Sequence, residues 1–151
     1  IRPAVNVGLS VSRVGGAAQT KAMKKASGSI RIDLAQYREM EVFTQFASDL
    51  DDATKAQLRH GSALMELLKQ PLCSPLSLWE QVATLCLAND GVFDKVETKD
   101  VKAYQREILD YMSIHYKKLC DSIDNEKVLT EEMEAELKEA AEHFQAKKSE
   151  E

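Results

Sequence analysis

The sequence predicts an all-α protein, a bundle of about five to seven helices preceded by an extended segment. Three observations support this fold class. From Ala17 onward, apolar residues recur at a spacing near 3.6, the period of an amphipathic helix. Clusters of proline, glycine, aspartate and serine divide that stretch into segments of helical length. After residue 16, no alternation of apolar and polar residues indicates a strand.

The composition indicates one soluble, globular domain. The 151 residues are 44% hydrophobic and 30% charged, which gives enough apolar content for a buried core. The sequence has neither an apolar run of about 18 residues nor a secretory signal, so we expect no direct membrane insertion. The chain opens with Ile1 instead of methionine, which suggests a processed product or a piece of a longer protein.

The first part of the chain differs from the rest. Residues 1–16 are rich in valine, serine and glycine, and Arg2 precedes a proline, which disfavours helix. We therefore predict an extended or looped segment there, followed by a helical domain over residues 17–147. The first helical region, residues 17–46, contains Gly28, which costs about 1 kcal/mol relative to alanine inside a helix. A kink or break is expected at this glycine.

Turn and capping residues mark the next helices. In "SDLDDATK", residues 48–55, Asp51 or Asp52 is placed to cap the helix that follows. That helix should stop before Pro71, because proline cannot continue it.

The segment "PLCSPLS" is then predicted to be a linker with two prolines. Ser74 followed by Pro75 is typical of an N-cap and a first helical position, which predicts a helix over residues 75–88. "NDG", ending at Gly91, closes that helix.

The remainder predicts a long helical region from about Thr98 and a last helix from Thr130. The first of these is long enough for two helices joined near residues 113–115. Glu131 lies in the favourable first turn of the last helix. The polar tail, residues 148–151, is expected to fray.

No motif for metal binding or self-contained catalysis occurs. Gly15 and Gly16 lack the G-K-[S/T] ending of a phosphate-binding loop, and no G-x-S-x-G is present. The histidines are isolated, and the spacing of "DLDD" does not match a calcium loop. Cys73, Cys86 and Cys120 are far apart and odd in number, which excludes a disulfide framework and predicts buried free thiols.

Charge is unevenly distributed along a chain whose net charge is −5. No acidic residue precedes Asp33, whereas this head is basic. Such a head could meet phosphate, an acidic partner surface or nucleic acid. No aromatic residue is interleaved to stack on bases, so nucleic acid is not expected as a partner. On the residues alone, Arg13 is a solvated arginine in a loose segment.

Longer strings resemble a known family. "SVSRVGGAAQ", "LAQYRE", "FASDLD" and "ELLKQ" are similar in order and spacing to the C-terminal part of the alpha subunit of F-type ATP synthases. The resemblance is dense over residues 1–70 and becomes looser afterwards, where "SPLS" still fits. It implies that β-barrel and P-loop domains precede this region in the full subunit. Residues 1–16 would then be the end of the nucleotide-binding domain.

The resemblance also implies roles for single residues. Arg13 matches the arginine finger that reaches the catalytic ATP site of the neighbouring beta subunit. Arg2, Pro3 and Gln70 match the adenine pocket of the non-catalytic site. Leu72 stands where a second glutamine is expected, so one amide donor and acceptor are lost there.

Partners and location follow from the same resemblance. Asp49 and Asp51 match a loop facing the gamma (rotor) subunit, and beta subunits are the other partners. ATP or ADP with Mg²⁺ would belong to the full complex, and none is expected in this piece alone. The complex, which translocates protons or sodium ions, would lie on the inner face of an energy-transducing membrane, on the cytoplasmic side of a bacterial plasma membrane.

Two functions remain open from the sequence. The chain would act in ATP synthesis or hydrolysis only within the complex, because it lacks a P-loop. The alternative is a freestanding helical interaction module without a catalytic partner.

Overall fold

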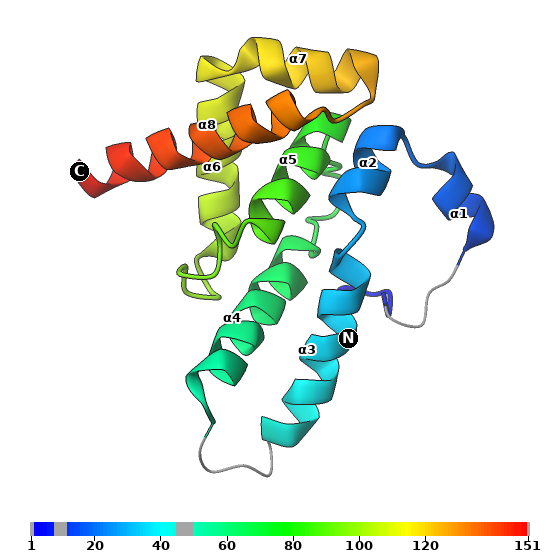
Figure 1. The fold of residues 1–151 in the computed structure, drawn as a ribbon, viewed down its shortest axis with the longest axis vertical. Helices are drawn as coiled ribbons and strands as arrows, with labels where there is room; N and C mark the ends of the chain where they lie inside the picture. The colour runs from blue at the N-terminus through cyan, green and yellow to red at the C-terminus, as the bar shows by residue number, and fades with distance from the viewer. Residues whose placement is uncertain (1, 8–11, 45–49, 151) are drawn as a thin grey trace.

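The fold is all-α, as predicted, in a computed structural model that describes residues 2–7, 12–44 and 50–150 (Figure 1). Within these ranges no strand occurs. The helices are α1 (Arg13–Ala18), α2 (Lys21–Ala26), α3 (Ile30–Thr44), α4 (Asp52–Leu67), α5 (Leu78–Asn89), α6 (Val101–His115), α7 (Lys117–Glu126) and α8 (Glu131–Glu150). The described part thus has more helices than expected, because α1 and α2 are separate pieces of six residues each.

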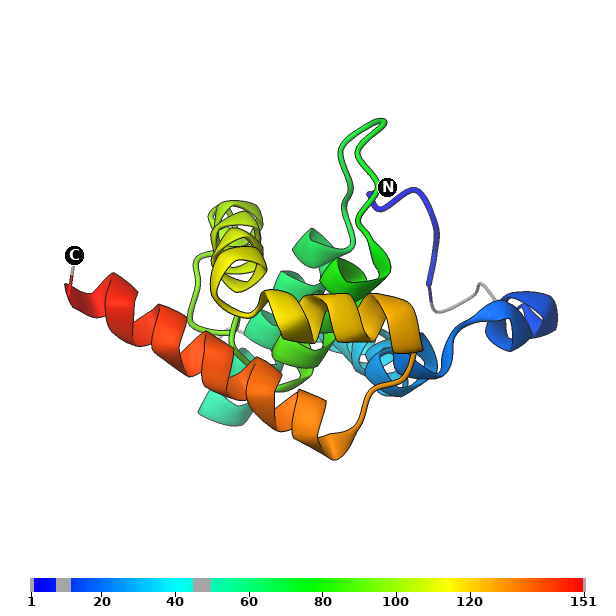
Figure 2. The same cartoon turned by 90° about the horizontal axis from the view of Figure 1, so that it is seen from above.

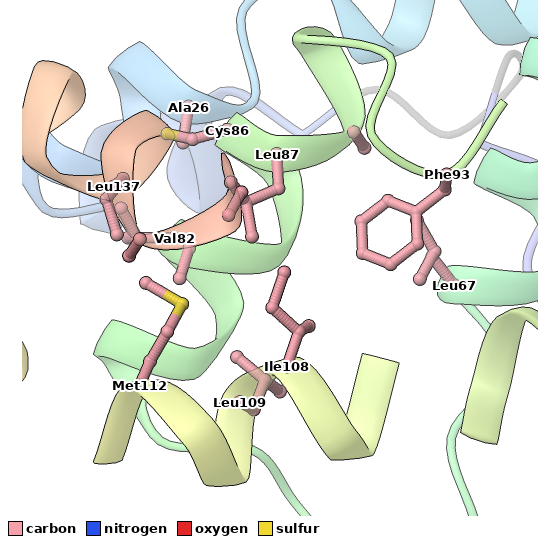
Figure 3. Packing of buried hydrophobic residues seen from close by; sticks show 14 of the residues in the cluster. Ala26, Leu67, Val82, Cys86, Leu87, Phe93, Ile108, Leu109, Met112 and Leu137 are labelled. Atoms are coloured by element: carbon pink, nitrogen blue, oxygen red, sulfur yellow. The ribbon is translucent and has the colours of Figure 1, made fainter. Parts of the chain in front are cut away.

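Helix α5 forms the centre of the bundle. It packs against α2, α4, α6, α7 and α8. Val82, Ala83 and Leu87 of α5 are fully buried, and Figure 3 shows Ile108 and Met112 of α6 and Leu137 of α8 around them. A helix that is apolar on most of its circumference is stable only when other helices surround it, which explains this central position.

Helices α3 and α4 form an antiparallel pair that extends away from the rest of the bundle (Figure 1). The expected break at Gly28 is confirmed, since α2 ends at Ala26 and α3 begins at Ile30. Ala22 and Ala26 are buried where α2 packs on α5. The break therefore lets α2 cover α5 while α3 follows α4.

Three predicted helix ends are confirmed. The Asp51 carboxylate accepts a hydrogen bond from the Thr54 N–H at 3.3 Å and caps α4. Gly91 has a φ of +72°, the left-handed conformation that suits a residue following a helix. The Thr130 hydroxyl accepts from the Met133 N–H at 3.2 Å at the start of α8.

The predicted start of α5 is wrong. Ser77, not Ser74, caps this helix, and Leu78 is its first residue. The Glu80 carboxylate accepts from the Ser77 N–H at 2.6 Å, and the Ser77 hydroxyl accepts from the Glu80 N–H at 3.4 Å. This capping box satisfies two backbone donors, whereas Ser74 is not followed three residues later by a glutamate.

The predicted extended segment is too long, because residues 13–16 belong to α1. The Ser12 hydroxyl accepts from the Gly15 N–H at 2.9 Å and starts this helix. A helix that includes Gly15 and Gly16 was not expected, because glycine has a low helix propensity.

The tail expected to fray, residues 148–151, is helical where it is described, since α8 continues to Glu150. Lys148 bonds Glu107 of α6 and lies 4.9 Å from the ring centroid of Tyr104. These contacts to α6 hold the last turns of α8 in place.

The cysteines divide into two groups. Cys86 and Cys120 are buried, as predicted, and burial raises the pKa of each thiol to about 12. Cys73 is exposed in the linker between α4 and α5, so the expectation of burial is wrong for this residue. Its neighbours in the linker provide no helix or core to cover it.

Candidate functional site

Arg13 is the first residue of α1, a helix that stands apart from the bundle (Figures 1 and 2). No residue of α1 is buried, and Val14 is 80% exposed. The cap from Ser12 makes the segment helical locally, without help from the core. Arg13 is therefore presented on a small, exposed helix instead of being packed against this chain.

The surroundings of Arg13 leave its guanidinium available. The first turn of α1 contains no acidic residue, and within the described ranges Arg13 forms no ion pair. A guanidinium offers five N–H donors in a rigid fork that fits carboxylate or phosphate oxygens. Arg13 can therefore donate to an anionic group supplied from outside the described chain.

Arg2 and Pro3 belong to the short segment of residues 2–7 that precedes α1. Arg2 is exposed and Pro3 is partly buried. The segment is attached to α3, because the Arg38 guanidinium donates to the Asn6 side-chain oxygen. Val7 adds an apolar contact with the core. The two predicted adenine-pocket residues are thus positioned through α3.

Gln70 lies just after α4, at the entrance to the linker, and is exposed. It lines a cavity of about 360 Å³ whose walls come from the linker, α5 and α6. Pro71 and Leu109 contribute apolar wall, while Lys102 and Arg106 bring positive charge. Leu72, the position where an amide was expected, is 94% exposed and does not line this cavity.

A buried polar cluster supports one wall of the cavity. The Lys102 ammonium donates to the Leu67 carbonyl at 3.1 Å and to the Gln105 side-chain oxygen at 2.9 Å. The Gln105 amide then donates to the Thr84 hydroxyl at 3.0 Å. Burial lowers the pKa of Lys102, because the charged form loses solvation. This cluster joins α4, α5 and α6, and no sequence pattern pointed to it.

Asp51 is exposed and already serves as the cap of α4. The hydrogen bond with the Thr54 side chain holds the pKa of the Asp51 carboxyl below its usual value. Asp49, the other residue expected to face a rotor, lies outside the described residues. Asp51 is therefore both the cap of α4 and an exposed acidic residue at the free end of the α3–α4 pair.

The predicted residues do not converge on one site. Gln70 is close to Lys102 and Arg106, but Asp51 lies at the far end of α4 and Arg13 lies on α1 (Figure 1). In the described ranges, no group of three or more histidine, cysteine or acidic side chains could hold a metal ion. None of the described helices is long and apolar enough to span a membrane. Arg13, Gln70 and Asp51 therefore lie on separate parts of the described surface.

Comparisons with known proteins identify the family. The sequence model of the C-terminal domain shared by ATP synthase alpha and beta chains matches residues 19–144, and the protein belongs to this family of helical domains. Among alpha subunits of ATP synthase, it is 52% identical over 144 residues to that of Petrotoga mobilis and 53% over 144 residues to that of Cupriavidus necator. It is 53% identical over 137 residues to the alpha subunit of Mycolicibacterium smegmatis.

The chain aligns with only part of each of these relatives. The alignments include 95%, 95% and 91% of this chain but 29%, 28% and 25% of the three relatives. The chain thus spans less than a third of their length, and its similarity is to the C-terminal domain of the ATP synthase alpha subunit.

Proposed function

We propose that this domain supports the alpha–beta hexamer of an F-type ATP synthase and supplies Arg13 as an arginine finger to the catalytic site of a neighbouring beta subunit. The single observation that carries the proposal is the presentation of Arg13. It lies on an exposed helix and forms no ion pair in the described part of the chain.

The chemistry of phosphoryl transfer supports this role for Arg13. Negative charge on the transferred phosphoryl group is stabilised by a fixed guanidinium, typically by about 10³ to 10⁵ in rate. A carboxylate beside the finger would neutralise it, and none precedes Asp33 in the sequence. The small residues of α1 would also let another subunit approach its backbone closely.

Nucleotide and Mg²⁺ would bind in the assembled complex. Arg2, Pro3 and Gln70 would contribute to the adenine pocket of a non-catalytic site, and Arg13 would meet phosphate oxygens. In the described residues, no group of three or more histidine, cysteine or acidic side chains could hold Mg²⁺.

Asp51, and with it Asp49, would face basic residues of the gamma subunit. The exposed position of Asp51 at the free end of the α3–α4 pair supports this contact. The complex, coupled to protons or sodium ions, would be located on the cytoplasmic side of a bacterial plasma membrane.

The test is to replace Arg13 in the full alpha subunit and assemble it with beta and gamma. Arg13→Ala and Arg13→Lys should each collapse multisite ATP turnover while assembly, measured by size-exclusion chromatography, stays near normal. Lysine keeps the charge but not the fork of donors, so it should not rescue. Near-normal turnover in either variant would mean that Arg13 is a solvated surface residue and not an arginine finger.

The second candidate is a freestanding helical interaction module. It is favoured by the exposure of α1, which any protein partner could cover. Under either function, purified residues 1–151 should neither bind ATP tightly nor hydrolyse it. Only assembly with beta subunits therefore distinguishes the two functions. Failure of the full-length subunit to assemble with beta would favour the freestanding module.

A further inference from the structure

Helices α3 and α4 are closely packed where Tyr37 faces Gly61. Gly61 is buried, and a Cβ built on it would overlap the Cβ, Cγ and Cδ2 atoms of Tyr37. Carbon atoms in contact are normally about 3.5 to 4.0 Å apart. The atoms concerned are at the base of the tyrosine side chain, so rotation of the ring cannot make room. Only glycine at position 61 permits this separation of the two helices.

This contact lies where the α3–α4 pair leaves the core. Gly61, Ala63, Leu64 and Leu67 are the buried residues of α4, and all are in its C-terminal half. The N-terminal half of α4, residues 52–60, has no buried residue. This half is held by α3 and by a contact of the His60 ring with the Asp94 carboxylate at 2.9 Å. At Gly61 the backbone of α4 lies directly against the side chain of Tyr37.

Further contacts near Tyr37 attach α3 to α4 and to the segment of residues 2–7. Toward the free end, the Gln57 amide donates to the Gln36 side-chain oxygen at 3.4 Å. The next residue of α3 after Tyr37 is Arg38, which donates to Asn6 of the segment 2–7. Helix α3 is thus held between α4 on one side and the segment that carries Arg2 and Pro3 on the other.

We propose that Tyr37 and Gly61 form a positioning contact that fixes α3 against α4 and thereby sets where Asp51 stands relative to the core. This inference rests on the proposed function, in which Asp51 faces the rotor. In this role Gly61 acts through the helix that carries Asp51. A methyl group at position 61 would push the helices apart and displace that end.

The experiment compares Gly61→Ala with Gly28→Ala in the full alpha subunit. A Cβ on Gly28 would meet the Lys24 and Lys25 carbonyl oxygens at 3.6 Å, an ordinary contact, so this variant is the matched control. Spin labels at the exposed positions Ala35 of α3 and Ala56 of α4 report the distance between the helices. We expect this distance to increase in Gly61→Ala and to stay unchanged in Gly28→Ala.

The functional readout is the ratio of ATP turnover in assemblies with the gamma subunit to turnover in assemblies without it. A role in fold stability alone would lower both rates together and leave the ratio unchanged. A displaced rotor contact should lower the ratio. Removing the obstructing side chain, in Gly61→Ala with Tyr37→Gly, should restore much of the ratio.

An unchanged label distance, or an unchanged ratio in Gly61→Ala, would overturn the positioning role. Asp51→Asn in the same assemblies tests the rotor contact on which the inference rests, since asparagine can still cap α4 but carries no charge for the gamma subunit. A normal ratio in Asp51→Asn would contradict the rotor contact itself, whereas a lowered ratio there with a normal ratio in Gly61→Ala would contradict only the positioning role.

Discussion

Helices α1 and α5 differ most in what holds them in place. α5 has Val82, Ala83 and Leu87 fully buried and is surrounded by five other helices. α1 has no buried residue and depends on the Ser12 cap and its own backbone bonds. Short isolated helices are marginal in water, because nucleation is costly and few bonds repay it. The difference indicates that α5 is stabilised by packing, whereas α1 is stabilised only by local hydrogen bonds.

The largest expected effect on stability comes from creating a cavity in the core around α5. Leu87→Ala should lower the free energy of unfolding by about 2 to 5 kcal/mol, because burial is lost and a cavity remains. Val14→Ala, the matched change on α1, should alter it by no more than about 0.5 kcal/mol. Chemical denaturation of residues 1–151 measures both. Equal losses in the two variants would mean that α1 is packed as firmly as the core.

Alkaline pH should distinguish buried from exposed thiols. Burial raises the pKa of Cys86 and Cys120 from 9.0 to about 12, so the unfolded chain releases these protons first. Stability is therefore retained below pH 9 and lost as pH rises from about 9 to about 12, by about 1.4 kcal/mol per pH unit for each thiol.

Replacing one buried cysteine tests this cause. Cys86→Ala should make the loss of stability above pH 9 less steep, because it removes one of the two buried thiols. The slope of unfolding free energy against pH is the relevant measurement, because a cavity at position 86 shifts all values equally. A slope unaltered by Cys86→Ala would contradict the assignment.

Helix caps should show the same contrast on a smaller scale. Ser77→Ala removes one half of the capping box of the central helix and should cost about 1 kcal/mol. Ser12→Ala unfolds only α1, which contributes nothing buried, so global stability should hardly change. Its effect should appear instead in the amide exchange of residues 15–18, which α1 protects weakly already. Similar losses of unfolding free energy in Ser77→Ala and Ser12→Ala would contradict this difference between α5 and α1.

Local chemistry allowed several features to be predicted. The fold class followed from apolar spacing, and the start of α4, the break at Gly28 and the turn at Gly91 followed from single residues with strong backbone preferences. The capping box at Ser77 could also have been found, since Glu80 follows three residues later. The prediction that Ser74 caps the helix and Pro75 begins it was wrong, because a serine followed by a proline is equally compatible with a linker.

The candidate site was predictable in parts. The identity of Arg13 as an isolated basic residue is visible from the absence of neighbouring acids in the sequence. Its helical setting was not, because two adjacent glycines have a low helix propensity. The Lys102–Gln105–Thr84 cluster was missed because its members approach each other only after α5 and α6 have packed.

The sequence by itself determined the helical class, several helix ends and the family, because these depend on neighbours within a few residues or on a long collinear string. The tertiary structure decided what depends on residues far apart. It placed α5 at the centre, held the end of α8 through Lys148 and Glu107, and brought Tyr37 against Gly61. Such contacts are set by the shape of the packed helices, which no local spacing encodes.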